Sequence, residues 1–273
     1  MKKFSLLLPV FLIIASITGS VSAQHINALS DRQIKDFARA LSTQHSIALA
    51  GVYSQLGSIC IPREQIDQKI DIKTRAFVTG NLQSTVYDAI NFNGTKMAEG
   101  VLISDHLRTL RYQFSPALYS ALDQLQQFLY NAISVNSFTV NIESFVDSKL
   151  PLMANNIEKL ILAGAAYMGS DSYTYWDAQI DNWSLVIAQS MGTPAGLNLF
   201  KADPKSIAAQ DLGGAVTGLA RGAYLGLTVG TMAIPGVGTV AGGAACALTG
   251  LIGGAILSSA GAGVKYLISK LFD

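Results

Sequence analysis

Apolar residues recur at helical spacing along most of the chain between residues 30 and 191. The first such stretch opens with Ser30 and Gln33, whose spacing is that of a capping box at the start of a helix. Apolar side chains then follow three or four positions apart until Gly57: Ile34, Phe37, Ala38, Leu41, Ala48, Val52 and Leu56. The pattern predicts a helix from residue 30 to about residue 56.

The same spacing predicts further helices over residues 63–91, 96–112, 116–134, 140–169 and 171–191. Turn-forming pairs separate several of them: Asn93-Gly94, Ser115-Pro116 and Gly169-Ser170. Residues 136–145 also alternate well enough for a short strand, and periodicity alone does not decide the matter at that length. We therefore predict an all-α fold, with a helical bundle over residues 24–191.

Two of these helices carry a continuous apolar stripe. In residues 116–134 the stripe is Leu118, Leu122, Leu125, Leu129 and Ile133. In residues 171–191 it is largely aromatic and consists of Tyr173, Trp176, Ile180, Trp183 and Ile187. Packing in the core of the bundle explains both stripes, and a ligand or glycan surface is the alternative for the aromatic one.

The composition changes abruptly after residues 192–211, which contain Pro194 and Pro204 and are predicted to be a linker. In residues 212–273 small residues then repeat every four positions. The repeated positions are Gly214, Gly218, Gly222, Gly226, Gly230, Gly238, Gly242, Cys246, Gly250, Gly254 and Ser258. Such a stripe lets two helix backbones approach closely. It predicts a hairpin of two helices, residues 213–233 and 238–264, with a turn at Pro235 and Gly236.

The physical setting that suits this hairpin is a membrane. Each glycine costs a helix in water about 0.8–1 kcal/mol relative to alanine, whereas in hydrocarbon a helix is almost obligatory. The two helices would be about 31 Å and 40 Å long, against a hydrocarbon core of roughly 30 Å. Between Gly222 and Val264 no residue is charged, and Arg221 is the exception just before. We predict transmembrane helices, with membrane lipid as partner and homo-oligomerisation through the glycine faces.

The first 23 residues have the pattern of a secretory signal peptide. Lys2 and Lys3 precede an apolar run over residues 4–17, and Ala23 ends a small-residue cleavage site. The pattern predicts export through a Sec-type signal. The product would be secreted or would stay in a bacterial envelope membrane.

Charge and motif patterns argue against several other classes of function. Of the 19 basic residues, Lys2 and Lys3 leave with the signal peptide, so 17 remain against 18 acidic ones and nucleic acid is not predicted as a partner. The three histidines, His25, His45 and His106, have no metal-ligand spacing. Cys60 and Cys246 could pair, but their spacing does not decide it. We predict no catalytic site, no metal and no cofactor, and hence no enzyme.

One further motif has the spacing of a nucleotide-binding loop, but the residues around it do not fit such a loop. Gly236, Gly238 and Ala241 match the spacing of a dinucleotide-binding loop. That loop follows a buried strand and needs an acidic residue about twenty positions later, whereas the next acidic residue here is Asp273. The sequence therefore does not predict nucleotide binding.

Residues 211–270 resemble the glycine-zipper hairpins of pore-forming bacteriocins and those of bacterial envelope proteins. A helical domain followed by an uncharged hairpin is also similar in plan to the pore domains of colicins. The resemblance implies a secreted bacterial protein whose C-terminal hairpin inserts into membranes, bacteriocin-like or pore-forming. One alternative is an envelope-resident, membrane-anchored scaffold or interaction protein. Another is a soluble protein in which the glycine hairpin is buried.

The signal-peptide pattern predicts that the mature protein begins at Gln24. Cleavage after Ala23 fits the small residues at the end of the apolar run. Intact-mass spectrometry of the exported product checks this, and a mass that includes residues 1–23 would contradict it.

Overall fold

The computed structural model of the chain describes residues 29–56, 97, 100–190, 203–229, 231–234 and 238–241. It also describes four single residues, Gln65, Gln68, Ile72 and Ala76. Near the C-terminus it describes the helical positions 250, 253–255, 258, 259, 261, 263 and 267, and we call these positions the C-terminal segment. In this part of the chain the fold is the predicted all-α helical bundle.

Helix α2 (Asp31–Leu56) begins where the capping box predicts. The Ser30 backbone N–H donates to Gln33 Oε1 at 2.9 Å, and the Gln33 N–H donates to Ser30 Oγ at 3.3 Å. These reciprocal bonds satisfy two backbone donors that a helix start otherwise leaves without partners. The apolar stripe of α2 is buried from Ile34 to Val52, so its spacing correctly indicated the face that packs against the bundle.

Helix α8 (Asn156–Ser190) is continuous through Gly169 and Ser170, so the predicted break there is wrong. A Cβ atom on Gly169 would lie 2.9 Å from Leu212 Cδ2. The glycine therefore leaves space for a neighbouring helix, and the intrahelical hydrogen bonds persist through it. The predicted helix 140–169 is instead divided at the 3-10 turn η3 (Leu150–Leu152), which contains Pro151.

The outer helices are α5 (Ile103–Arg108), α6 (Pro116–Asn131) and α7 (Val135–Lys149). Helix α7 includes residues 136–145, so the strand alternative for that stretch is wrong. Ser134 caps α7, with its Oγ accepting from the Ser137 N–H at 3.1 Å. The stripe of α6 is buried as far as Leu129, whereas Ile133 lies beyond the end of the helix and is 93% exposed.

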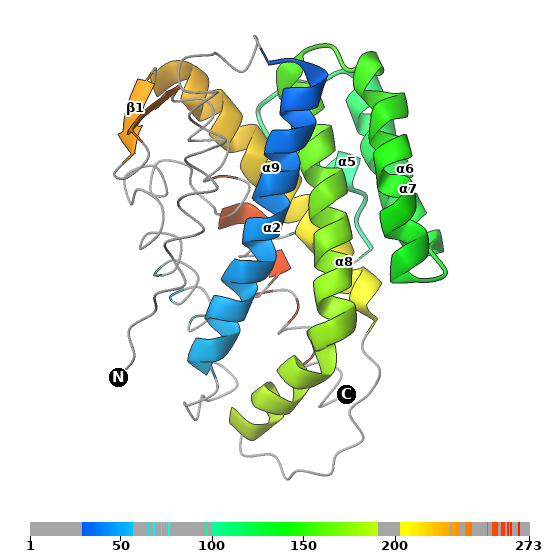
Figure 1. Cartoon of the computed structure of the whole chain (residues 1–273), viewed down its shortest axis with the longest axis vertical. Helices are drawn as coiled ribbons and strands as arrows, with labels where there is room; N and C mark the ends of the chain where they lie inside the picture. The colour runs from blue at the N-terminus through cyan, green and yellow to red at the C-terminus, as the bar shows by residue number, and fades with distance from the viewer. Residues whose placement is uncertain are drawn as a thin grey trace.

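Helix α8 lies between α2 on one side and α9 (Pro204–Val229) on the other. Figure 1 shows that α2 and α8 run in the same direction, α9 crosses them in the opposite direction, and α6 and α7 form an outer layer. The Lys159 ammonium pairs with Asp31 at 2.6 Å, which joins the first turns of α2 and α8. Since α2, α6, α7 and α9 all contact α8, this helix organises the bundle.

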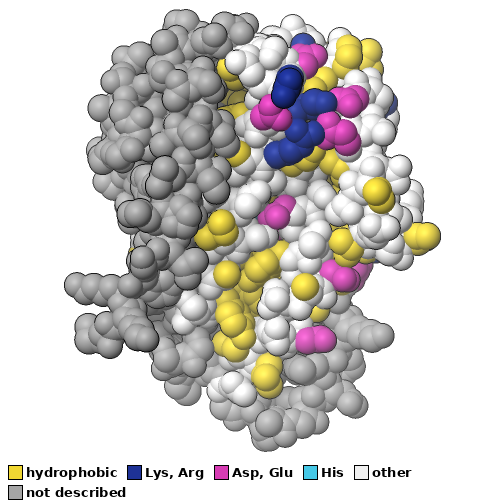
Figure 2. Space-filling model, in the orientation of Figure 1, with side chains coloured by type: hydrophobic (Ala, Val, Ile, Leu, Met, Phe, Trp, Pro, Cys, Tyr) yellow, Lys and Arg dark blue, Asp and Glu magenta, His cyan; other side chains and the backbone are white. Residues whose placement is uncertain are grey.

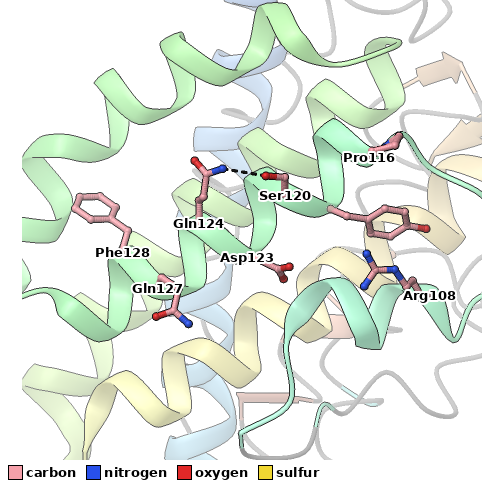
Figure 3. Close-up of a pocket in the computed structure, with 8 residues that line it drawn as sticks. Arg108, Pro116, Ser120, Asp123, Gln124, Gln127 and Phe128 are labelled. Carbon is pink, nitrogen blue, oxygen red and sulfur yellow. Dashed lines mark hydrogen bonds between the residues drawn. The ribbon is translucent and has the colours of Figure 1, made fainter.

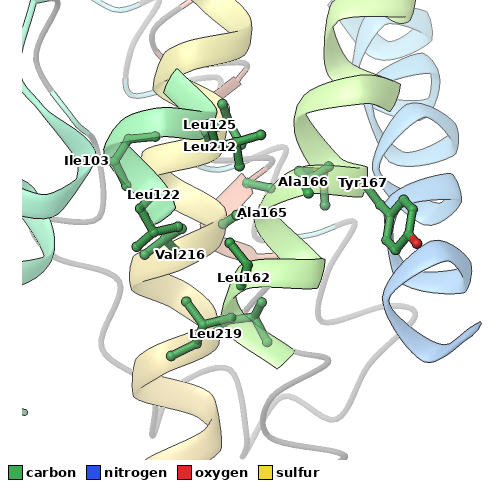
Figure 4. Close-up of a cluster of buried hydrophobic side chains, with 14 of the residues drawn as sticks. Ile103, Leu122, Leu125, Leu162, Ala165, Ala166, Tyr167, Leu212, Val216 and Leu219 are labelled. Atoms are coloured by element: carbon green, nitrogen blue, oxygen red, sulfur yellow. The ribbon is translucent and has the colours of Figure 1, made fainter. Parts of the chain in front are cut away.

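The core forms where α5 and α6 meet α8 and α9. Figure 4 shows Leu122 of α6 and Ile103 of α5 facing Val216 of α9, with Leu162 and Ala165 of α8 beside them. All of these side chains are buried. The aromatic stripe of α8, Tyr173 to Ile187, is buried as well, which confirms core packing as its role.

Two short strands follow α9, β1 (Thr231–Ile234) and β2 (Gly238–Ala241), paired antiparallel with Ile234 opposite Gly238. They replace the adjoining ends of the two predicted helices. β-branched and glycine residues dominate here, and both types form helices poorly. Helix α9 begins at Pro204, so residues 204–211 of the predicted linker are helical. The helices that the structure describes include none with the length and hydropathy of a membrane span.

A charged cluster on the surface joins α2 to α7 and α8, and Figure 2 shows it as a patch of mixed sign. Lys35 Nζ lies 2.7 Å from Glu143 Oε1, and Arg39 and the Tyr167 hydroxyl both reach Glu143 Oε2. Although burial opposes ionisation, hydrogen bonds from Lys35, Tyr167 and Arg39 lower the pKa of Glu143 to about 2. Glu143 therefore favours the folded state only while it is ionised.

Replacing Glu143→Gln is expected to lower the free energy of unfolding at neutral pH by about 1 kcal/mol, since a partly exposed network is screened by water. The ordinary pKa of this carboxyl is 4.5, so its contribution is complete above that pH and is lost as the pH falls through about 2. Urea denaturation from neutral to acidic pH checks this. The control Asp36→Asn removes an exposed partner of Arg39, and an equal acid response in both variants would contradict the prediction.

Candidate functional site

Helix α9 is buried on every face over residues 207–220. A helix that is apolar all round belongs to the centre of a protein or to a membrane. Thr217 is among its few buried polar residues, and its hydroxyl bonds to the Gly213 carbonyl within the helix at 2.8 Å. The notable polar group in α9 is Asp211, whose side chain is fully buried.

The glycines of α9 pack directly against backbone atoms of the C-terminal segment. A Cβ atom on Gly218 would overlap the carbonyl oxygen of Gly250, and one on Gly214 would lie 2.5 Å from the carbonyl oxygen of Gly254. A Cβ on Gly250 would lie 3.2 Å from Gly222 Cα. A position four residues later in α9 therefore contacts a position four residues earlier in the C-terminal segment. The two form an antiparallel pair whose backbones touch at Gly218 and Gly250, and the Ser258 side chain lies against Gly214.

The structure places the predicted packing residues unevenly. Gly214, Gly218, Gly222, Gly250, Gly254 and Ser258 meet one another across this contact. Gly226 lies in α9 and Gly238 in β2. The other predicted positions lie outside the described residues: Gly230, Gly242 and Cys246, and the turn residues Pro235 and Gly236.

A buried polar cluster lies beside the glycine contact and joins four segments. Asp211 Oδ2 accepts hydrogen bonds from the Ser172 hydroxyl of α8, from Trp176 Nε1 at 3.2 Å, and from the Ser259 hydroxyl of the C-terminal segment at 2.6 Å. Trp176 Nε1 also lies 2.9 Å from Ser259 Oγ. The carboxylate therefore connects α9 to α8 and to the C-terminal segment at one point.

His45 of α2 completes the cluster from the other side. Its ring is fully buried, with Nε2 at 3.7 Å from Asp211 Oδ2 and Nδ1 at 3.6 Å from Asp171 Oδ2. Neither ring nitrogen has a hydrogen-bond partner, and neither does Asp211 Oδ1. The Ser46 hydroxyl donates to Asp171 at 2.5 Å, on the same side of the ring. The imidazole is thus held between two carboxylates without a hydrogen bond to either.

Burial raises the pKa of Asp211 to about 6, against the charge of His45 and the three hydrogen bonds that favour the ionised form. Asp211, His45 and the two serines that bond to Asp211 are closed to solvent, and the hydroxyls of Ser172 and Ser259 point to a carboxylate instead of a histidine nitrogen. That arrangement does not activate a serine as a nucleophile. No group of three or more metal-binding side chains occurs among the described residues. What the geometry can do is bind or release a proton between packed helices.

A second candidate is an open hollow of about 790 Å³ beside α5 and α6. It is lined by Arg108, Pro116, Tyr119, Ser120, Asp123, Gln124, Gln127 and Phe128. Figure 3 shows that Gln124 bonds to Ser120 of its own helix, and Arg108 lies over the Tyr119 ring at 4.4 Å from the centroid. Because several of its polar groups are already engaged with neighbours, we give this hollow less weight than the buried cluster.

The polar cluster was not among the predicted sites, although the sequence carries a signal for it. His45 stands four residues after Leu41 and three before Ala48, inside the apolar stripe of α2. Asp211 stands three residues after Ala208 and four before Ala215 in α9. A polar residue within an apolar stripe is buried with it and needs a partner. Spacing alone does not say that these two residues face each other.

Comparison of the chain with protein-family models, curated proteins and solved structures gives no match. The function is therefore inferred from the glycine contact and the polar cluster themselves.

The glycine contact predicts unequal effects of the same substitution at two glycines. Alanine is favoured over glycine in a helix by about 1 kcal/mol, yet Gly218→Ala is expected to lower the free energy of unfolding by about 1–3 kcal/mol. Its Cβ would meet a backbone carbonyl, which moves only if the helices separate. Urea denaturation followed by tryptophan fluorescence measures the change.

Gly169→Ala is the matched control. Its Cβ would meet the end of the Leu212 side chain, which can rotate away, so the stability should stay within about 1 kcal/mol of the wild type. Equal stability of the two variants would show that close backbone packing between α9 and the C-terminal segment is not required.

Proposed function

We propose that this chain is an exported bacterial protein that acts on membranes, bacteriocin-like or pore-forming. Its glycine-zipper hairpin, formed by α9 and the C-terminal segment, is stored in the helical bundle and inserts into a target bilayer after the bundle opens. Membrane lipid is the partner, and no catalytic group or cofactor takes part.

The observation that carries this proposal is the burial of α9 on every face over residues 207–220. Helix α6 has an apolar side and a polar side, as expected of a helix at the bundle surface, and α9 over this range has no polar side. A helix of this kind needs either a protein shell or hydrocarbon around it. The surrounding helices supply the shell in the bundle, and a bilayer would supply the hydrocarbon after insertion.

The glycine contact suits both environments. Close backbone approach depends on dispersion contacts and weak hydrogen bonds, and both persist when water is replaced by lipid. The pair could therefore enter a membrane without exchanging its internal contact. In the closed pair the stripes of Gly218 and Gly250 cover each other. Association of copies through the same stripes would require the hairpins to open and exchange partners.

Two basic residues of α9, Lys205 and Arg221, must be accommodated when the hairpin inserts. Lys205 Nζ donates to the carbonyl oxygens of Tyr130 and Ala132, at 3.2 and 2.6 Å, which holds the start of α9 at the end of α6. Arg221 lies further along the helix, and burial lowers its pKa. In a bilayer the long side chain of Arg221 would reach the headgroups by snorkelling.

The experiment that tests the proposal is dye release. The purified full chain is added to dye-loaded vesicles of phosphatidylcholine and phosphatidylglycerol, and release is expected. The double variant Gly222→Leu/Gly226→Leu should bind the vesicles yet release dye about tenfold more slowly or worse, because leucine side chains separate the helix backbones.

The control variant is Leu225→Ile/Leu227→Ile, which conserves side-chain volume beside the stripe and should release dye as the wild type does. Wild-type release from the leucine variant would remove close glycine packing as the mechanism. Stable binding of the wild type without release would favour the alternative, a membrane-anchored scaffold in the envelope.

A further inference from the structure

We propose that the Asp211 carboxyl, which faces α2, α8 and the C-terminal segment, is a proton-controlled latch. A proton on this carboxyl holds α9 against α2 and α8, and loss of the proton frees the hairpin. This inference rests on the proposed function, because it assigns the step that controls release of the hairpin. The latch closes in acid and loosens towards neutral and alkaline pH.

The geometry gives the latch its dependence on protons. The three donors to Asp211 all reach Oδ2, and Oδ1 is buried without a hydrogen-bond partner. A protonated carboxyl is neutral and can itself donate a hydrogen bond. Loss of the proton therefore places a charge in the centre of the fold with one of its two oxygens unpaired.

Each segment packed around Asp211 contributes defined groups among the described residues. Helix α2 contributes His45, and α8 contributes Asp171 together with the neutral donors Ser172 and Trp176. The C-terminal segment contributes the Ser259 hydroxyl. Of these groups only His45 and Asp171 are ionisable side chains, and the others are neutral hydrogen-bond donors.

The sign of the effect follows from the burial of Asp211. Burial raises its pKa from 3.8 to about 6, so the closed state binds a proton more tightly than a state in which Asp211 meets water. The stabilisation is complete below the ordinary pKa and is lost as the pH rises through about 6. A difference of about two pKa units corresponds to about a 100-fold change in the ratio of closed to open molecules.

The position of Asp211 fits release towards a membrane. It precedes the long uncharged part of the hairpin, so insertion of the following residues would leave Asp211 near the headgroups and in contact with water. Its carboxyl would there regain an ordinary pKa. Because Asp211 binds its proton more tightly in the closed state than in the inserted state, acid favours the closed state.

The test measures opening and release separately on the purified full chain, from about pH 4 to about pH 8. Opening is followed by urea denaturation with tryptophan fluorescence, since the chain has two tryptophans and both Trp176 and Trp183 are buried. Release is followed with the same dye-loaded vesicles at each pH. The wild type should lose about 100-fold in the equilibrium constant for closure across this range, and dye release should rise in parallel.

Three variants separate the latch from a merely structural role. Asp211→Asn removes the titrating proton and should flatten both profiles. Ser172→Ala removes a donor that favours the ionised form, so the midpoint of opening should move to higher pH. Asp105→Asn makes the same chemical change in an exposed carboxylate of α5 and should keep the wild-type profile.

The outcomes distinguish the two proposals. A flat wild-type profile, or the wild-type profile retained in Asp211→Asn, overturns the latch. If Asp211→Asn fails to fold, the direction of the shift in Ser172→Ala decides, and a shift to lower pH overturns the latch. Dye release at every pH without any pH dependence removes the latch and keeps the membrane function. If opening depends on pH but no dye is released at any pH, the latch stands and the membrane function is removed.

Discussion

The contact between the backbones of α9 and the C-terminal segment is the constraint on which the rest of the bundle depends. At Gly218 and Gly250 there is no room for even one methyl group, so the pair is as thin as two helices can be. On the neighbouring helix α8, the absence of a side chain at Gly169 likewise lets Leu212 of α9 lie close to the α8 backbone. The dispersion energy of many such short contacts replaces what large interdigitating side chains supply in an ordinary core. A bulky residue in the stripe would move the elements around it as well.

The polar cluster lies where this thin pair meets α2 and α8, and it orders elements that apolar packing alone would leave able to slide. Trp176 illustrates this double role, since its ring packs at a tilt against Trp183, 5.3 Å between centroids, while its Nε1 bonds to Asp211 and Ser259. Hydrogen bonds have directions that dispersion lacks, so they fix one register of α9 against its neighbours. Burying a carboxylate costs stability, and the three donors offset part of that cost.

The sequence predicted those features that depend on local spacing. Ser30 and Gln33 marked the start of α2, the leucines of α6 marked its buried face, and the four-residue repeat marked the positions where helix backbones meet. It failed where a distant partner decides the outcome. Gly169 looks like a break because its local preference is weak, and only Leu212 from α9 explains why it lies within a continuous helix. Pro151 divides the predicted helix at a residue whose local effect was available and was not used.

The functional cluster was hidden for the same reason. His45, Asp171, Asp211 and Ser259 are far apart in the chain, and each one alone has an ordinary explanation. Only the folded arrangement, with α9 between α8 and the C-terminal segment, brings them together. The spacing of apolar residues shows which face of a helix is buried. It does not show which face of which other helix packs against it.

The parallel pairing of α2 with α8 has a consequence for the order in which the chain folds. Asp31 meets Lys159, and Ser46 meets Asp171, so the first helix finds its partner more than a hundred residues later. Closing so long a loop is entropically costly and slow compared with forming local helix pairs. During synthesis the apolar stripe of α2 therefore stays without its native cover until α8 has been made. The N-terminal helix is thus among the last elements to reach its final place, although it is the first described helix to be translated.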